Sequence, residues 1–453
     1  MSTIAAISTG QAAGGIGIVR ISGENAVPVA DRIFESVSGV KLEKLKGYRA
    51  AFGKVKSEKG FIDEAVALVF RAPKSYTGED VVEISCHGGL LVTKQVLRAA
   101  LSNGAEAAAP GEFTKRAFLN GKIDLTRAEA VMDIIGAKSE QSEQAAFQTL
   151  EGSLFNKINK ISLFLKGLAA SLAAWVDYPD EEIDDISDEE LLEKIESADG
   201  ELRELIAGFD TGRIVTQGVE TAIIGRPNVG KSTLMNMLSG YEKSIVTSVA
   251  GTTRDIVEES VSLGGIILHL ADTAGLHETD DTVEKIGVDR TKKRTQRATL
   301  ILAVFDSSEQ LNEEDEKIFE LCRGKNAVAV INKTDLEPKL NAEIINNNFK
   351  NVVYISAKNN SGIKELEQSV EKLLGTEGFD TSSAMLNNER QLACCKQAQE
   401  SLAQAAEGLR AGITRDAINV NIDVAIEALD TLTGEKATES VVNEIFSRFC
   451  VGK

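Results

Sequence analysis

Eight residues near the middle of the chain, GRPNVGKS at Gly225–Ser232, have the spacing of a phosphate-binding loop. The apolar run before them predicts a strand and the residues after them predict a helix, which is the context that such a loop requires. Glycine lets backbone N–H groups turn toward phosphate oxygens, and the start of a helix adds positive potential. Lys231 would reach the terminal phosphates, and the Ser232 hydroxyl would bind Mg²⁺. Because plain glycine turns can match the pattern, it does not establish the chemistry alone.

Two further motifs supply the chemistry of the metal and the terminal phosphate. GTTRD, at Gly251–Asp255, offers Thr253 as a second ligand for Mg²⁺. DTAG, at Asp272–Gly275, follows an apolar run, so that Asp272 can hold the metal through water while Gly275 meets the γ-phosphate. Their order after the loop excludes a plain glycine turn.

The base would be recognised by two motifs that follow later strands. In NKTD, Asn332–Asp335, the Asp335 carboxylate can accept hydrogen bonds from the two donors of a guanine edge, which adenine cannot match. Asn332 and Lys333 would brace that pocket, and SAK, Ser356–Lys358, would contact the base through its backbone. Because these motifs all follow predicted strands, where α/β sheets bind ligands, we predict a site for guanine nucleotides.

One residue departs from the pattern of Ras-type enzymes, which carry a glutamine directly after DTAG to orient the attacking water. This chain has Leu276 there, and a leucine cannot orient water. A carboxylate within DDTVEKIG, residues 280–287, is the favoured replacement, whereas His277 is favoured as a surface or packing residue. Arg254 could act as an internal arginine finger, although the adjacent Asp255 equally suggests an ordinary salt bridge.

Composition narrows the class of protein. At 453 residues the chain is too long for one core, and its 43% hydrophobic and 26% charged residues are typical of globular domains. It has neither a long apolar run nor a secretory signal, so we expect a cytoplasmic location and no membrane partner. The net charge of −19 repels phosphate backbones, so any nucleic acid should bind through a local basic patch or a basic partner. Five cysteines without CxxC spacing indicate free thiols rather than a zinc site.

The pattern of apolar and polar residues changes along the chain. The first part mixes short β-like runs at 16–21, 65–70 and 81–85 with a probable helix at 90–102, which predicts a compact α+β domain. Helical periodicity follows, with one apolar face and a probable N-cap at Ser187. From residue 218 apolar runs alternate with helical stretches, which predicts a doubly wound α/β sheet with strands at 220–224, 266–270, 300–305, 327–331 and 352–355. Helical periodicity then returns after the α/β module, so we interpret that module as an insertion in a helical domain.

The motifs taken together resemble the MnmE (TrmE) family of tRNA modification GTPases over essentially the whole chain. The nucleotide motifs are shared with many GTPases, whereas the stretches toward the two ends of the chain make the resemblance specific. The stretches that carry it are GGIGIVRISG, SYTGEDVVEISCHGG, PGEFTKRAFLNGKIDL, DYPDEEID, GRPNVGKST, VAGTTRD, DTAGLH, VEKIGVDR and the terminal FCVGK.

The resemblance implies a multidomain α+β and α/β fold. An N-terminal α+β domain similar to tetrahydrofolate-binding proteins, which also dimerises the family, is expected over residues 1–120. A discontinuous helical domain is expected over 121–217 and 376–453, the second segment carrying the CVGK ending. A Ras-like P-loop GTPase domain is expected as an insertion over 218–375.

The resemblance also implies the activity. The family works as a homodimer, in a heterotetramer with an FAD-dependent protein, MnmG. Together they add an aminomethyl or carboxymethylaminomethyl group to C5 of the wobble uridine of certain tRNAs. A folate, 5-formyltetrahydrofolate or a relative, supplies the one-carbon unit. GTP is hydrolysed to GDP with Mg²⁺ and K⁺, and FAD enters only through the partner.

Residue roles follow from the same resemblance. Asn228, with the loop around Thr247, Val249 and Thr252, would bind K⁺ in place of an arginine finger, and Glu284 would orient water. Mg²⁺ is assigned to Ser232 and Thr253. The expected GTP contacts are Asn228, Val229, Gly230, Lys231, Ser232, Thr233, Thr247, Ser248, Val249, Ala250, Gly251, Thr252, Thr253, Asp272, Thr273, Ala274, Gly275, Asn332, Lys333, Asp335, Ser356, Ala357 and Lys358. The folate site carries over to Arg20, Glu83, Lys122 and Lys453.

The chain ends in an apolar segment that contains Cys450. A prenylation box fits badly there, since Gly452 and Lys453 close the sequence and no polybasic stretch precedes them. The apolar residues around the cysteine predict that the tail docks, and the family uses this ending in its modification reaction. Arg448 and Lys453 could favour the thiolate, so Cys450 is a catalytic candidate, with redox, structural and simple packing roles left open.

Two other functions compete with this interpretation. A regulatory GTPase that assembles ribosomes would carry the same nucleotide motifs, but such factors commonly add a basic RNA-binding domain and this chain is strongly acidic. A folate-dependent methyltransferase acting alone would not need a GTP switch.

Overall fold

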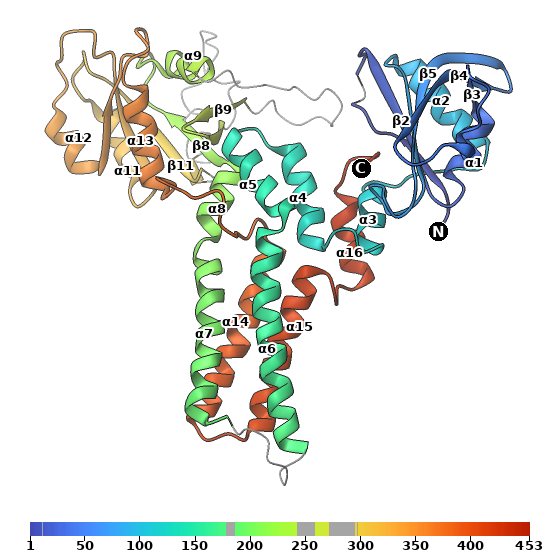
Figure 1. Ribbon diagram of the computed structural model, residues 1–453. Coiled ribbons are helices and arrows are strands. Elements are labelled where there is room, and N and C mark those ends of the chain that lie inside the picture. The colour runs from blue at the N-terminus through green and yellow to red at the C-terminus, as the bar shows by residue number, and fades with distance from the viewer. Residues whose placement is uncertain (11, 178–185, 242–258, 271–294, 297) are drawn as a thin grey trace. The chain divides into compact units, whose positions relative to one another are not determined.

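The computed structural model describes residues 1–10, 12–177, 186–241, 259–270, 295–296 and 298–453. The chain divides into two compact units, each built from separated segments of sequence (Figure 1). The first unit comprises Met1–Met132, Ile158–Ser171 and Ile422–Lys453. The second comprises Asp133–Lys157 and Leu172–Asn421. In the part of the chain that the structure describes, no helix is long and apolar enough to cross a membrane.

The first unit is built on a mixed sheet of seven described strands, in the order β3-β4-β5-β6-β2-β1-β7. The strands are β1 (Ile4–Ile7), β2 (Ile16–Ser22), β3 (Phe34–Ser36), β4 (Arg49–Ser57), β5 (Gly60–Phe70), β6 (Val81–His87) and β7 (Glu106–Ala107). Alternate residues of β5, namely Ala65, Ala67 and Val69, are buried, as expected for a strand with one covered face. That face packs against α1 (Ala26–Ile33) and α2 (Leu90–Ser102).

The predicted strands and helix of this unit are confirmed, whereas β1, β3, β4 and β7 are additional. The additional strands are short or carry polar residues in place of a clean apolar run. Helices α3 (Glu112–Leu119) and α16 (Glu439–Ser447) complete the unit together with parts of α4 (Leu125–Gly136), α6 (Ser153–Asp177) and α15 (Arg415–Thr433). A small core joins α4 to the end of the chain, formed by Leu125, Ala128, Val442, Phe446 and Phe449.

The second unit contains a doubly wound sheet in the order β13-β12-β11-β8-β10-β9. Its described strands are β8 (Val219–Ile224), β9 (Glu259–Leu263), β10 (Ile266–Leu270), β11 (Leu300–Asp306), β12 (Ala327–Asn332) and β13 (Asn351–Tyr354). All neighbours pair in parallel except β9, which pairs antiparallel with β10. The five predicted strands are confirmed to within a residue at either end, and β9 is the strand that sequence patterning missed.

Helices cover both faces of this sheet, because its central strands are apolar on both sides. On one face Val304 and Val330 pack with side chains of α9 (Lys231–Tyr241) and α13 (Ile363–Leu374). On the other, Phe305 packs with α11 (Glu313–Cys322) and α12 (Ala342–Asn348). The fold class predicted from the alternation of strands and helices is therefore confirmed.

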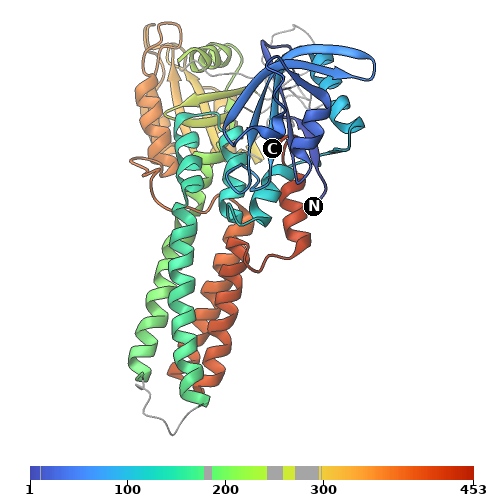
Figure 2. The same cartoon turned by 45° about the vertical axis from the view of Figure 1, so that its right-hand side comes forward.

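The rest of the second unit is helical: α5 (Glu140–Glu151), α7 (Asp188–Ala207), α8 (Phe209–Gln217) and α14 (Glu389–Arg410), with parts of α4, α6 and α15. Helices α7 and α14 run side by side in Figures 1 and 2. Ser187 caps α7 by accepting a bond from the Glu190 N–H, as predicted. The predicted apolar face of α6 is also confirmed, because Leu154, Ile158, Ile161, Leu165 and Leu168 are buried.

Candidate functional site

The phosphate loop leaves β8 and ends where α9 begins at Lys231. Three of its residues have positive φ: Gly225 at 159°, Asn228 at 64° and Gly230 at 97°. The Lys231 amine donates to the carbonyl oxygens of Gly225 (2.9 Å) and Arg226 (2.6 Å). The amine therefore lies against the loop that the sequence predicts as the phosphate cradle.

Asn332 of the NKTD motif joins three of the predicted motifs. Its Nδ2 donates to the carbonyl oxygen of Val229 (2.9 Å), and its Oδ1 accepts from the backbone N–H of Ala357 (3.0 Å). Asn332 is buried, and a Cβ added to Gly230 would lie 2.2 Å from Nδ2. The close approach explains why glycine is needed at that position of the loop.

The residues predicted to face guanine are held by short polar contacts. The Ser356 hydroxyl donates to Asp335 Oδ1 at 2.6 Å. This bond, together with the backbone N–H of Asp335 itself, holds the pKa of the Asp335 carboxyl below its usual value. Lys333 forms an ion pair of 2.5 Å with Asp306, the last residue of β11. Asp335 is thus presented as a carboxylate, the form that accepts from two N–H donors of guanine.

A buried ion pair that sequence reasoning missed anchors the phosphate loop. Arg226 Nε lies 3.0 Å from Asp315 Oδ1 without the alignment of a hydrogen bond, so the contact is ionic. Asp315 also accepts from the N–H of Asn312, which completes the capping box of α11. Burial raises the pKa of Asp315, and the bond from Asn312 and the charge of Arg226 offset this only in part. No periodic pattern links residues this far apart in sequence.

Part of the predicted nucleotide site lies outside the described residues. This applies to the glutamate predicted to orient water, to the loop predicted to bind K⁺ and to the two motifs predicted to serve the metal: Thr247, Ser248, Val249, Ala250, Gly251, Thr252, Thr253, Asp272, Thr273, Ala274, Gly275 and Glu284. Of the predicted metal ligands, Asn228 and Ser232 are described. Asn228 is exposed and Ser232 stands in the first turn of α9. The loop and the start of α9 fit a phosphate with its Mg²⁺, since the hydroxyl follows the phosphate-binding lysine directly.

A second constellation lies on the sheet of the first unit. Arg20 on β2 and Glu83 on β6 are directly opposite one another, and Arg20 Nη2 lies 2.8 Å from Glu83 Oε1. The guanidinium carbon of Arg20 is 5.5 Å from the ring centres of both Tyr76 and Phe113. Lys122, predicted beside this pair, is exposed and donates to the carbonyl oxygen of Pro73 (3.2 Å).

The end of the chain docks next to this pair. The carbonyl oxygen of Gly452 accepts from Ser8 Oγ (3.1 Å) and from Arg20 Nη1 (3.5 Å). The N–H groups of Gly111 and Phe113 donate to the carbonyl oxygens of Cys450 (3.3 Å) and Lys453 (3.2 Å). The tail therefore continues as an ordered segment to the last residue.

The docking rests on aromatic side chains and on one glycine. Phe446 and Phe449 are buried as predicted, whereas Val451 is 52% exposed. Gly452 has φ of 100°, and a Cβ there would meet the Ile7 carbonyl oxygen at 2.3 Å. Cys450 is exposed, so the packing role left open for it is wrong. Arg448, expected to favour the thiolate, donates instead to Glu444 at 2.7 Å.

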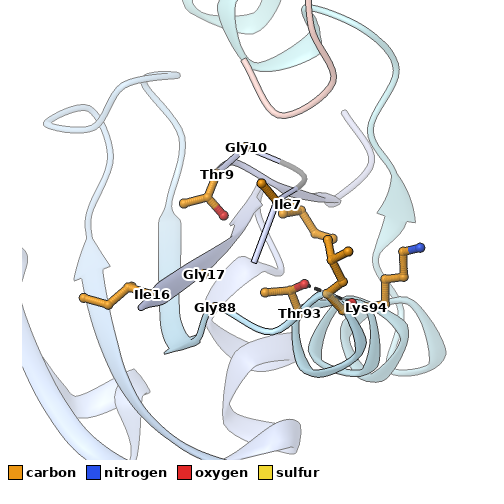
Figure 3. A pocket seen from close by; sticks show the side chains of 10 residues that line it. Ile7, Thr9, Gly10, Ile16, Gly17, Gly88, Thr93 and Lys94 are labelled. Atoms are coloured by element: carbon orange, nitrogen blue, oxygen red, sulfur yellow. Dashed lines mark hydrogen bonds between the residues drawn. The ribbon is translucent and has the colours of Figure 1, made fainter. Parts of the chain in front are cut away.

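Two hollows lie on the first unit. One of about 20 Å³ lies at the start of α2 beside Gly17, Gly88 and Thr93 (Figure 3), and its volume suits about one water. The other, of about 600 Å³, is lined by residues of α3 and α16 together with Met1 and Ser2. Neither hollow is lined by Arg20, Glu83 or Cys450.

The chain is similar to known proteins over its whole length. A family profile described as "MnmE helical domain" matches residues 125–450, and one described as "GTP-binding protein TrmE N-terminus" matches residues 3–122. Proteins named "tRNA modification GTPase MnmE" from Lactobacillus delbrueckii subsp. bulgaricus and Thermoanaerobacter pseudethanolicus are 44% and 41% identical. Each match covers 100% of this chain, with 98% and 99% of the relative.

Similar solved structures share only part of the chain. The G domain of the T. maritima FeoB iron transporter is 24% identical, with a TM-score of 0.26, over 34% of this chain and 98% of that one. Era in complex with MgGDPNP and a segment of 16S ribosomal RNA is 30% identical, with a TM-score of 0.27, over 40% of this chain and 66% of that one.

Proposed function

Because the chain belongs to the MnmE family, we propose that it hydrolyses GTP to drive modification of C5 of the wobble uridine in certain tRNAs. The observation that carries the proposal is the docking of the terminal CVGK segment beside Arg20 and Glu83. A GTPase that only regulated assembly would have no need of a cysteine-bearing tail whose Gly452 carbonyl docks against an ion pair in a separate unit.

The nucleotide half of the proposal rests on the described motifs. Asn332 connects the phosphate loop to the SAK loop, and Asp335 is presented as a carboxylate for guanine. Ser232 and Thr253 are proposed as Mg²⁺ ligands, and the metal would neutralise charge on the terminal phosphates. Lys231 is proposed to hold those phosphates in the loop.

Potassium is proposed to complete the site. Asn228 is exposed at a left-handed position of the loop, which supports its role as a K⁺ ligand with Thr247, Val249 and Thr252. A cation there would supply the charge that an arginine finger supplies elsewhere. Glu284 is proposed to orient the attacking water in place of the glutamine that Leu276 replaces.

A one-carbon folate is the proposed ligand of the Arg20–Glu83 site, with Lys122 and Lys453 as further contacts. The Glu83 carboxylate can accept from the N–H donors of a flat heterocycle, and the Arg20 guanidinium paired with it lies over the rings of Tyr76 and Phe113. The exposed Cys450 is proposed to take part in the modification itself, as nucleophile or redox group.

The proposed assembly is a homodimer joined by a second protein, the FAD-dependent MnmG. Support for a homodimer comes from the sheet face opposite α1 and α2, where Ile16, Phe52 and Val66 are 67%, 54% and 40% exposed. Apolar residues that gather on one exposed face are typical of an interaction surface. A tRNA substrate places the proposed activity in the cytoplasm.

The test compares tRNA nucleosides, by mass spectrometry, from a strain that lacks the gene. We expect the C5 substituents to be absent, to return with the wild-type gene, and to stay absent with Lys231→Ala or Cys450→Ser. The Cys450→Ser protein should still hydrolyse GTP, faster in KCl than in NaCl. If the wobble uridines of the deletion strain keep their C5 substituents while precursor ribosomal subunits accumulate, the proposal is overturned in favour of ribosome assembly.

A further inference from the structure

A strongly basic segment lies between α1 and β5 in the first unit. Residues 41–60 carry seven lysines or arginines and two glutamates, a local net charge of +5 in a chain whose net charge is −19. The chain as a whole repels a phosphate backbone, so a concentrated excess of positive charge marks a place where one can approach.

Four cations at the start of this segment are available to a ligand. All four side chains are exposed, and none forms an ion pair with another residue that the structure describes. By contrast, Lys56 further along the segment is paired with Glu35 at 2.9 Å. We call the four available residues the basic strip: Lys41, Lys44, Lys46 and Arg49.

The backbone under the basic strip is held rigidly. Arg71 donates to the Glu43 carbonyl oxygen at 2.7 Å, and the Asp31 carboxylate accepts from the N–H groups of Leu42 (2.6 Å) and Glu43 (2.9 Å). The Leu42 side chain is fully buried, which fixes the short helical turn Leu42–Lys44 on the domain. A surface that is already ordered loses little conformational entropy when it binds.

An exposed aromatic ring interrupts the cations. Tyr48 is 62% exposed, and its ring makes a T-shaped contact with that of Phe70, with ring centres 5.5 Å apart and planes at 82°. Its φ of 61° is unusual for a bulky residue, and its N–H is bound to the Val69 carbonyl oxygen at 2.8 Å. Most of the Tyr48 surface is accessible, and single-stranded RNA bases stack on exposed aromatic rings between cationic contacts.

We propose that the basic strip and Tyr48 form a contact surface for the phosphate backbone of tRNA. This inference rests on the proposed function, since it assumes that tRNA is the substrate. The cations contact phosphates, and Tyr48 stacks on an unpaired nucleotide. The acidic remainder of the chain then keeps the RNA from binding elsewhere on its surface, so that a weakly binding strip is sufficient for orientation.

The experiment measures binding of fluorescent, unmodified tRNA to the full-length protein by anisotropy, in NaCl from 50 to 200 mM. The test variant carries Lys41→Gln, Lys44→Gln, Lys46→Gln and Arg49→Gln. The control variant removes the same charge from exposed lysines of the second unit: Lys317→Gln, Lys350→Gln, Lys364→Gln and Lys372→Gln. GTP hydrolysis should be unchanged in both, which shows that both fold.

We expect the strip variant to bind at least about tenfold more weakly at 50 mM salt, and the control variant to bind like the wild type. Four phosphate contacts contribute about 100-fold to the loss of affinity between 50 and 200 mM salt, so the strip variant should lack that part of the salt dependence. Tyr48→Leu should weaken binding without changing the salt slope, because stacking releases no counterions.

Three results of the tRNA titration would overturn the inference. They are equal binding by the strip and control variants, an unchanged salt slope, and no tRNA binding by the wild type at 50 mM salt. The last result would leave the proposed function intact if the C5 substituents still depend on the gene, since the partner protein would then carry the tRNA. A basic strip that captured an acidic protein and not tRNA would likewise refute it.

Discussion

Asn332 and Val229 are joined by a hydrogen bond of 2.9 Å, from the side-chain amide of the first to the carbonyl oxygen of the second. The bond connects the end of β12 to the phosphate loop. Since Asn332 also accepts from Ala357, one buried side chain holds the phosphate loop and the SAK loop, predicted to bind the base, in a fixed relation. The nucleotide site therefore depends on a residue that need not touch the nucleotide.

Asn332→Ala should weaken GDP binding. The substitution leaves the Val229 carbonyl and the Ala357 N–H without their partner, at a cost of about 1–3 kcal/mol, or roughly 5- to 150-fold in affinity. Titration with a fluorescent GDP analogue measures it. Asn346→Ala, at an exposed position of α12, is the control and should bind normally. Equal affinities in the two variants would refute the bracing role.

Guanine selectivity should not change between pH 8 and pH 5. The hydrogen bond from Ser356 holds the pKa of Asp335 below its ordinary value of 3.8. A carboxylate with a lowered pKa keeps its contacts at higher pH and loses them only as the pH falls through that lowered value. The measurement is the ratio of affinities for GDP and IDP, because the phosphates are common to both. A ratio that falls above pH 5 would contradict the assignment.

Gly452→Ala should release the tail. The added Cβ meets the Ile7 carbonyl oxygen at 2.3 Å, and φ of 100° is strained for alanine. Hydrogen exchange at the N–H groups of Gly111 and Phe113 should become faster, because the tail carbonyls accept from them. Gly121→Ala is the matched control, with φ of 67° but open space around it. GTP hydrolysis should survive in both variants, whereas C5 modification should fail only in Gly452→Ala.

Cys450 should be the first thiol to react in the folded protein. Burial raises the pKa of Cys86 to about 11 and that of Cys322 to about 12, so neither supplies thiolate at pH 8. Cys450 is exposed. Brief alkylation with iodoacetamide at pH 8, followed by peptide mass mapping, locates the label. Denaturant should then open the buried thiols to reaction, and equal labelling of Cys86 in the native protein would disprove the burial argument.

Asp315→Ala should destabilise the second unit by about 3 kcal/mol, since it leaves the poorly exposed Arg226 guanidinium without its buried partner and removes part of a helix cap. Urea unfolding followed by circular dichroism measures the change. Glu314→Ala, in the same turn but exposed, should stay within about 0.5 kcal/mol of the wild type. If the two variants unfold at the same urea concentration, the ion pair contributes nothing to the stability of the second unit.

The pattern of neighbouring residues predicted those helices and strands that interactions between neighbouring residues stabilise. Five of the six described strands of the doubly wound sheet, helix α2 and the Ser187 cap were predicted from the sequence, because periodicity and capping involve neighbours in the chain. Strand β9 was missed, since its alternating sequence ESVSL is short and its pairing with β10 supplies the stabilisation. The ion pair of Arg226 with Asp315 was missed for a related reason. Both partners look like ordinary surface charges until the fold buries them.

The prediction of a guanine nucleotide needed only the sequence, because it depends on residue types at fixed short spacings within GRPNVGKS, NKTD and SAK. The tertiary structure decided which distant residues meet. It placed the Gly452 carbonyl 3.5 Å from Arg20 Nη1, and it left Lys122 bound to Pro73 rather than to the Arg20–Glu83 pair. Such contacts follow from the path of the backbone and from the burial of Phe446 and Phe449 at the chain's end. Packing of that kind is a property of the whole unit and is not encoded in the spacing of any one motif.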